Sequence, residues 1–547
     1  MKFNIKNNIG MKSTALMAGF VLLFGSSCEK FLDSQPTGTQ TVETAFTTVA
    51  DGNALIVGPY RRLTAWTGGA GDYGNGFPST LEFQHGKAFT ADSHGLYQNF
   101  QNNEISGSML SDFDKPWGDW FTGVRDANFS IDRLPSVKDM TEAQRKAGLG
   151  EVRALRAWYY LNLVRMFGDV QLVTKPLTDL ALAQAPRVSL KTIFDEVIIP
   201  DLEYAVNEAG LPAGRSTGGR VTKDVARTIL ADAYLTAAGY PYQEVATDPT
   251  KDWCVKGLWT MQGYPVNSSS SKEFYKKAKE QLDALVNGGV YTMGTYDDLH
   301  DPAKKNAVQM IWQAQYNDSF DYIGYTLPGL SLISVYTEYG THVPSLEYYQ
   351  AYDPADKRIA ERQMFFTQDN IQVGKDATTP LIKFSQPHLY KWYDAAAIKS
   401  TGKSTINWTM YRYADVLLMS TEVNWALTQL GEAVSEADVI KGINLVRGMA
   451  NLPAYRGSDI NVTAILAERA YELVGENKLQ WDYRRMRTAL VDGAGKFTSQ
   501  NFIGHKPTGF TFNFTAQNLL SPIANSEIAN NRAALQNFGY TPKQVGQ

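Results

Sequence analysis

The chain has only two cysteines, Cys28 and Cys254, in 547 residues. This scarcity excludes a fold stapled by several disulfides, and no intramolecular disulfide can form if Cys28 is modified. The six histidines are far apart and none belongs to an HExxH motif, so the sequence gives no indication of a transition-metal site. Core packing must therefore stabilise the chain.

One apolar run stands out, Thr14–Gly25, and it is too short to span a bilayer, which needs about 20 apolar residues. Basic residues precede it without any acid, which is typical of a secretory signal over residues 1–27. The small residues Gly25, Ser26 and Ser27 stand directly before Cys28, although Gly25 replaces the usual Leu. We therefore predict a lipoprotein signal with lipidation at Cys28, followed by a polar tether over 28–42. The alternative is an ordinary secreted protein cleaved near Cys28.

The chain also lacks an excess of positive charge. Its formal net charge is −4, and removing the three lysines of the signal would leave 49 basic against 56 acidic residues, a net charge of −7. Nucleic acids are polyanions, so they are excluded as the expected partner.

Common catalytic motifs are missing as well. A formal GxGxxG, Gly69–Gly74, neither follows an expected strand nor opens a helix, as dinucleotide binding requires. No GxSxG nucleophile elbow is present. A glycosidase-like carboxylate pair stays open at this point, because such a pair is recognised by its separation in space.

Helical periodicity covers much of what is present. An amphipathic or broadly apolar face recurs through most of the chain, with Gly168 expected to stop one helix and Thr222 and Gly239 expected to cap another. The expected helices are Glu43–Leu63, Trp117–Leu134, Thr141–Phe167, Ser189–Ala209, Thr222–Ala238, Lys272–Val286, Arg412–Leu430, Glu436–Met449 and Thr463–Leu490.

Two regions lack this periodicity and are rich in Gly, Asn, Pro and aromatic residues. They are the loop insertion 64–114 and the irregular segment 291–408, which contains two strand-like runs, Val308–Gln315 and Thr379–Phe384. Long loops in compact domains are usually functional or disordered. We therefore predict a mostly α fold: tetratricopeptide-like helix pairs forming a superhelix, with long irregular loops and a few short strands.

Charged residues in the last long helical stretch could suggest acid–base catalysis, but ion pairs and caps are the simpler interpretation. The same holds for Arg153 and Arg156, which lie three residues apart on one helix face. The charged residues in question are Glu468, Arg469, Glu472, Glu476, Asp482, Arg484 and Arg485.

Several blocks resemble the SusD/RagB family of outer-membrane nutrient-binding lipoproteins. The most specific is GEVRALRAWYYLNLVRMFGDVQLVTKP at Gly150–Pro176. The other blocks are FLDSQPTGTQTVETAF, ALIVGPYRRL, GRVTKDVARTILADAYLTAAG, YRYADVLLMSTEVNWAL, INLVRGMANL, AERAYELVGENKLQWDYRRM and LLSPIANSEIANNRAALQNFGY. The resemblance spans nearly the whole mature chain and divides it into an N-terminal SusD-like region, 43–290, and a C-terminal SusD/RagB region, 291–547. Thr421, Gln480 and Phe538 depart from the family pattern.

The resemblance implies a non-catalytic glycan-binding lipoprotein of the outer membrane. It is expected to face the cell exterior, capture an oligosaccharide or polysaccharide and deliver it to a SusC-like TonB-dependent transporter.

 

Two alternatives stay open at this point. Part of the family resembles peptide-uptake lipoproteins of the RagB type, so a captured peptide is one alternative. A surface glycoside hydrolase is the other, since a carboxylate pair is not visible in sequence.

In the family, the binding surface comes from the variable loops, which here are 64–114 and Tyr291–Tyr352. Sugar rings present apolar faces and hydroxyl rims, so recognition needs aromatic platforms and polar partners on loops of a rigid body. The candidate stacking platforms are Trp66, Tyr73, Tyr97, Tyr296 and Tyr322, and the candidate hydrogen-bonding residues are Asn99, Asn317 and Asp318. We expect Trp117, Trp120, Trp158, Trp425 and Trp481 to be core residues instead.

No cofactor is expected. Asp297 and Asp298 most simply form a solvated turn, and although acidic loops of this kind can hold calcium, no EF-hand spacing is present.

Overall fold

Helices that pack in chain order make most of the fold. The computed structural model describes residues 45–65, 81–89, 99, 101–105, 113–176, 184–315, 333–334, 337–338, 343–366, 371–372, 381–382, 387–391 and 406–541. The helices are α1 (Val49–Val57), α2 (Arg61–Ala65), α5 (Asp114–Arg133), α6 (Glu142–Phe167), α8 (Leu190–Ile193), α9 (Ile199–Asn207), α10 (Lys223–Ala238), α11 (Tyr242–Val245), α12 (Trp253–Lys256), α13 (Ser269–Val286), α14 (Tyr296–His300), α15 (Leu346–Gln350), α17 (Tyr413–Gln429), α18 (Glu436–Met449), α19 (Val462–Glu472), α20 (Leu479–Met486) and α21 (Asn525–Asn530).

Short 3₁₀ segments and one π segment extend or join these helices. They are η2 (Gly58–Tyr60), η4 (Leu134–Ser136), η5 (Phe194–Ile198, the π segment), η6 (Pro302–Lys304), η7 (Lys357–Ile359), η8 (Gly457–Asp459) and η9 (Ala516–Leu519). The expected helix Ser189–Ala209 is therefore present as α8, η5 and α9.

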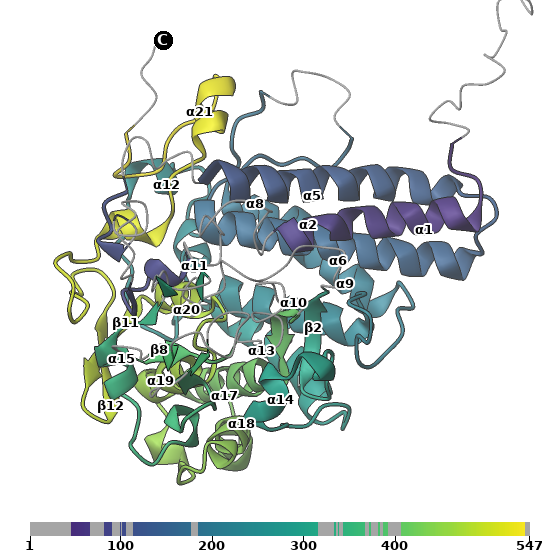
Figure 1. Cartoon of the computed structure of the whole chain (residues 1–547). Coiled ribbons are helices and arrows are strands. Elements are labelled where there is room, and N and C mark those ends of the chain that lie inside the picture. Colours follow the sequence, from purple (N-terminus) through teal and green to yellow (C-terminus); the bar gives the residue numbers. More distant parts are fainter. Residues whose placement is uncertain are drawn as a thin grey trace, which may run out of the picture. The chain divides into compact units, whose positions relative to one another are not determined.

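The packing order is that of a helix-pair array. α5 packs on α6, α6 on α9, α9 on α10, α10 on α13, α13 on α17 and α17 on α18 (Figure 1). Each pair buries faces that neither helix could bury alone, as in tetratricopeptide-like repeats. The predicted mostly α, tetratricopeptide-like scaffold is confirmed.

Local signals set the helix ends. Thr141 caps α6 by accepting a hydrogen bond from the Gln144 backbone N–H, and the Gln144 side chain accepts in return from the Thr141 N–H at 2.8 Å. Gly168 ends this helix with φ of 74°, a backbone conformation that favours glycine. Thr222 caps the start of α10 and Gly239 its end, as the sequence predicts.

One expectation is wrong. Thr463–Leu490 is not a single helix: α19 ends at Glu472, α20 begins at Leu479, and Thr488 already belongs to a strand. Gly475 and Asn477 adopt φ of 73° and 59°, and Arg487 adopts φ of 50°. These left-handed residues break the helical path, and two of the three are Gly and Asn, the residue types that adopt this conformation most readily.

The strands form two-stranded antiparallel pairs. They are β1 (Ala88–Phe89), β2 (Met310–Ala314), β3 (Ile333–Ser334), β4 (Thr337–Glu338), β5 (Val343–Pro344), β6 (Phe365–Phe366), β7 (Ile371–Gln372), β8 (Leu381–Ile382), β9 (His388–Leu389), β10 (Trp408–Arg412), β11 (Thr488–Gly493) and β12 (Lys496–Asn501). The pairs are β1–β5, β2–β10, β3–β4, β6–β9, β7–β8 and β11–β12. β2 and β8 fall inside the two expected strand-like runs, whereas the β11–β12 hairpin was not expected.

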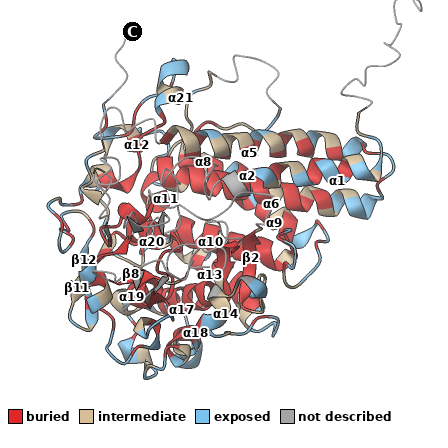
Figure 2. Cartoon of the chain, viewed as in Figure 1, coloured by how far each residue is buried: buried red, intermediate tan, exposed pale blue. Residues whose placement is uncertain are grey.

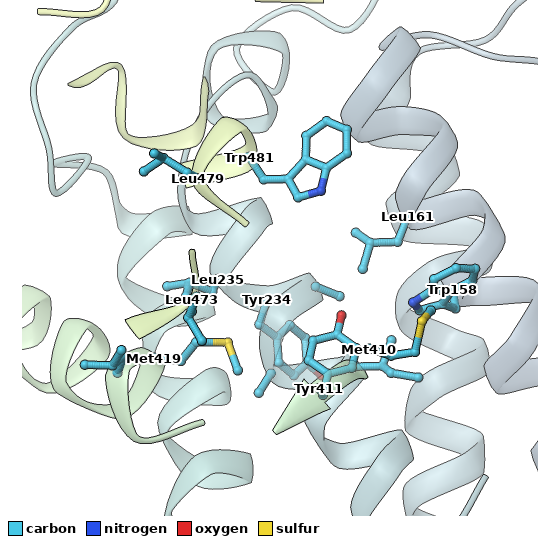
Figure 3. Close-up of a cluster of buried hydrophobic side chains, with 14 of the residues drawn as sticks. Trp158, Leu161, Tyr234, Leu235, Met410, Tyr411, Met419, Leu473, Leu479 and Trp481 are labelled. Carbon is cyan, nitrogen blue, oxygen red and sulfur yellow. The ribbon is translucent and has the colours of Figure 1, made fainter. Parts of the chain in front are cut away.

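A continuous core joins the two halves of the residues from Thr48 to Gln547, which form one compact unit. Most residues of α6, α10 and α17 are buried, whereas α1 and α5 also carry intermediate and exposed residues (Figure 2). In Figure 3, Trp158 and Leu161 of α6 lie near Tyr411 of β10 and Trp481 of α20. The five tryptophans expected in the core are all buried; they are Trp117, Trp120, Trp158, Trp425 and Trp481.

Most of the charged residues of the C-terminal motifs form buried ion pairs. Arg469 pairs with Asp415 at 2.9 Å and with Asp482 at 2.7 Å. In the N-terminal half, Arg156 donates to Asp201 at 2.7 Å. The predicted ion pairs are therefore present at Arg156, Arg469 and Asp482.

None of the described helices is both long enough and apolar enough to cross a membrane.

Candidate functional site

A short strand pair brings the two irregular regions together. β1 lies in the first region and β5 in the second, and they pair with Ala88 opposite Pro344 and Phe89 opposite Val343. The Ser345 N–H extends the pairing by donating to the Lys87 carbonyl at 2.9 Å. The chain that leaves β1 and the chain that enters β5 therefore meet at one place.

Two further strand pairs gather the other chain ends of the irregular segment. β6 pairs with β9, so the chain between residues 366 and 388 leaves and returns at adjacent strands. β5 also contacts β9. β2 pairs with β10, with Ala314 opposite Trp408, so the end of β2 lies beside the start of β10. We call these strand ends the loop bases.

Residues 81–89 fix the first loop base. The side chains of Glu82, His85 and Lys87 are all buried. His85 and Glu82 lie 2.8 Å apart, and the other Glu82 oxygen accepts from the Asn477 N–H at 2.6 Å. Lys87 Nζ lies 2.7 Å from Asp492 on β11. This segment is a buried anchor inside what the sequence suggests is a long loop.

Glu472, at the end of α19, anchors the second region. Its Oε2 accepts from the Tyr296 hydroxyl at 3.0 Å and from Arg358 at 3.2 Å, and its Oε1 accepts from Arg412 at 2.7 Å. Lys391 donates to the Glu472 carbonyl at 3.1 Å. We call these five residues the Glu472 hub.

Electrostatics in the hub favour the charged carboxylate. Burial would raise the pKa of Glu472, but the guanidinium groups of Arg412 and Arg358 hold that pKa below its ordinary value. Burial also lowers the pKa of Lys391, against the attraction of Glu476. A carboxylate held ionised by two guanidinium groups is a poor general acid, so the hub is suited to holding structure.

Amide side chains occupy the loop base at β2 and β10. Gln315 donates to the Asn306 side chain at 3.0 Å and accepts from it at 2.9 Å. Asn407 donates to the Gln315 side-chain oxygen at 3.0 Å, and Gln313 donates to Thr409 at 3.1 Å. This amide network holds the end of β2 against the start of β10.

Two interior cavities lined by described residues are too small for a sugar. Two cavities of about 20 and 30 Å³ lie beside Arg165 and Trp481, which is space for a water molecule or two. A surface hollow of about 550 Å³ lies between residues 354–360 and 448–451. Its lining contains no aromatic side chain, so it offers no stacking platform.

Most predicted site residues lie outside the described residues. They are Trp66, Tyr73, Tyr97, Tyr322, Asn317, Asp318 and the lipidation site Cys28. Asn99 is described: it is half-buried in a helical turn, and its carbonyl accepts from the Glu104 N–H at 2.8 Å.

Tyr296 requires a correction. Its side chain is 0% exposed and its hydroxyl donates to Glu472, so neither face of the ring is available for a sugar. The sequence suggested a loop aromatic because Tyr296 opens the irregular segment. Tertiary packing turns it inward, and its function in this conformation is to anchor α14.

Asp297 and Asp298 also differ from the expected turn. They lie in the first turn of α14, where Asp298 and Thr295 form a capping box. Among the described residues, no group of three or more His, Cys, Asp or Glu side chains is arranged to hold a metal ion.

The helix-pair array defines a helical scaffold protein. Short strand pairs at the loop bases hold described parts of its irregular regions together. The sequence model of the SusD family matches residues 236–540, and a second model, described as starch-binding associating with outer membrane, matches residues 30–235. The protein belongs to the SusD family.

Individual relatives agree with this assignment. The SusD-like protein P2 of Formosa agariphila is 24% identical over 500 residues, which cover 83% of this chain and 87% of that protein. A SusD superfamily protein from Parabacteroides distasonis is similar in structure, with a TM-score of 0.76, 28% identity and coverage of 90% of this chain and 99% of that one. Surface glycan-binding protein A from Bacteroides thetaiotaomicron, solved in complex with laminarihexaose, shares the fold with a TM-score of 0.66 and 20% identity over 90% of this chain and 100% of that one.

Proposed function

We propose that this protein is a non-catalytic, cell-surface lipoprotein that captures an oligosaccharide and delivers it to a SusC-like TonB-dependent transporter. The observation that carries the proposal is the β1–β5 pair, which joins the two aromatic-rich regions at one place. Family membership and the laminarihexaose complex of a relative with the same fold support a glycan as the ligand.

The proposed binding surface draws on both regions. Trp66, Tyr73 and Tyr97 belong to the first region, and Tyr322 belongs to the second. Flat aromatic rings cover the apolar faces of sugars, and Asn99, Asn317 and Asp318 supply hydrogen bonds to the hydroxyl rims. Tyr296 is no longer part of this set.

Capture of this kind requires no bond chemistry. The carboxylates at the loop bases serve as anchors: Glu472 is paired with arginines, and Asp492 is paired with Lys87. We propose that binding also needs no cofactor, because stacking and hydrogen bonding suffice. Removing divalent ions with EDTA should leave glycan affinity unchanged, and a loss restored by calcium would contradict this.

We propose that Cys28 carries the lipid anchor and that the protein faces the cell exterior. A family description that includes outer-membrane association supports the location. Protease treatment of intact cells should digest the protein. A protein that resists until the envelope is opened would contradict the outward orientation.

The central experiment is a glycan array on the chain starting at Glu29, which contains the whole compact unit from Thr48 to Gln547. Positive glycans are then titrated against Trp66→Ala and Tyr97→Ala. A lost stacking contact of about 1 kcal/mol weakens binding about fivefold. Phe538→Ala is the matched control, because Phe538 is an aromatic with 40% exposure at a distance in sequence from both regions.

Three results would contradict the proposal. The array would show no glycan bound, or new reducing ends would form when the protein is incubated with a bound polysaccharide, which would establish a hydrolase. The third is failure of the membrane-extracted full chain to co-purify with a TonB-dependent transporter. Binding of peptides in place of glycans would identify a RagB-like peptide-capturing protein.

A further inference from the structure

Four separate segments of the second irregular region and its border meet at Glu472, three at its carboxylate and one at its backbone carbonyl. Tyr296 lies in α14 and Arg358 lies in η7. Lys391 lies two residues after β9, and Arg412 is the last residue of β10. All four donate a hydrogen bond to Glu472.

The hub is closed to solvent. The side chains of Glu472, Arg358 and Arg412 are at most 1% exposed, and Lys391 is 3% exposed. Because water cannot replace a lost partner there, the relative positions of the four segments depend on these contacts. Moving one donor requires the others to adjust.

A second buried network also joins a carboxylate, an arginine and a tyrosine hydroxyl, but it lies in the helical scaffold and not at a loop base. Glu422 of α17 accepts from Arg485 of α20 at 2.7 Å, and it also accepts from the Tyr264 hydroxyl. Its helices belong to the scaffold, and none of these three residues borders a loop base. A phenol donating to a buried, arginine-paired carboxylate thus occurs twice, once at the loop bases and once in the scaffold.

We propose that Glu472 is a positioning residue for ligand binding: it sets the spacing of the segments that carry the second irregular region, so that glycan affinity depends on the hub separately from global stability. The affinity part rests on the proposed function. The positioning part concerns the protein alone and is measurable without any ligand.

Tyr296→Phe tests the proposal with the smallest change, because it removes one hydrogen bond and retains the ring. Tyr264→Phe is the matched control. Amide hydrogen exchange is measured for peptides covering 296–300, 387–391 and 406–412, and the affinity for laminarihexaose and for glycans positive on the array is measured by titration calorimetry. Urea unfolding gives the global stability of each variant.

We expect Tyr296→Phe to speed exchange at least fivefold in residues 387–391 and 406–412 and to weaken glycan binding at least fivefold. Tyr264→Phe should change the exchange rates of these residues and the glycan affinity by less than twofold, even if it lowers the urea unfolding midpoint as much as Tyr296→Phe does. Equal exchange in the two variants would overturn the positioning role, and faster exchange with unchanged affinity would overturn its link to binding. If the wild-type protein binds no glycan, the proposed function fails, while the exchange comparison still decides whether the hub holds the segments.

Discussion

The buried pair between Lys87 and Asp492 tests how the first loop base is held. Lys87 is 0% exposed and Asp492 is 3% exposed, with Nζ and Oδ1 at 2.7 Å. The second oxygen of Asp492 is buried without a hydrogen-bond partner among the described residues. Lys87→Met therefore leaves an ionised carboxylate with no compensating charge, and we expect it to lower the free energy of unfolding by about 3–5 kcal/mol.

The reverse comparison isolates the cause. Burial lowers the pKa of Lys87 despite the attraction of Asp492, which indicates a large desolvation cost for the pair. Replacing both charges with apolar groups removes that cost, so Lys87→Met combined with Asp492→Val should recover at least half of the lost stability. The coupling between the two substitutions should be about 3 kcal/mol.

Urea unfolding followed by tryptophan fluorescence measures these changes. Lys251→Met is the control, because Lys251 and Asp248 are 52% and 39% exposed and lie 3.9 Å apart. It should cost less than about 0.5 kcal/mol. A loss under about 1 kcal/mol for Lys87→Met, or a double variant no more stable than the single one, would refute the reasoning.

Three further predictions concern acid stability, helix packing and capping. Burial lowers the pKa of His388 from 6.5 to about 3, so the unfolded chain takes up a proton before the folded protein does as the pH falls. The free energy of unfolding is therefore highest above pH 6.5, and about 2.5 kcal/mol of it is lost between pH 7 and 4.5. His388→Gln should lack this loss in urea titrations at the two pH values, and an unchanged pH dependence would contradict it. A Cβ at Gly123 would lie 2.5 Å from the Tyr159 ring, whereas a Cβ at Gly118 would meet nothing within 4 Å. Gly123→Ala should therefore lower the free energy of unfolding by about 1–3 kcal/mol, and Gly118→Ala should raise it. Equal effects of the two substitutions would contradict this prediction and show that α5 can shift. Thr141→Ala should cost about 1 kcal/mol through the lost α6 cap, which thermal melting checks against the exposed Thr250→Ala.

Local interactions are what the sequence by itself determined. The ends of α6 and α10 depend on contacts within a few residues, and so the sequence predicts them. These ends are the α6 cap at Thr141, the α6 stop at Gly168 and the α10 caps at Thr222 and Gly239. Periodic apolar faces likewise predict the paired helices. The prediction of one helix over Thr463–Leu490 was wrong, because it followed the apolar periodicity across Gly475 and Asn477, which adopt positive φ and interrupt the helix.

Only the tertiary structure decided how the loop bases are held. The pairing of β1 with β5, the contact of Lys87 with Asp492 and the burial of Tyr296 all join residues far apart in the sequence. Such contacts depend on which surfaces the helix array brings together, and a strand of two residues has no periodicity to detect. An aromatic side chain in an irregular segment can face a ligand or a buried carboxylate, and only the tertiary structure shows that Tyr296 faces the Glu472 carboxylate.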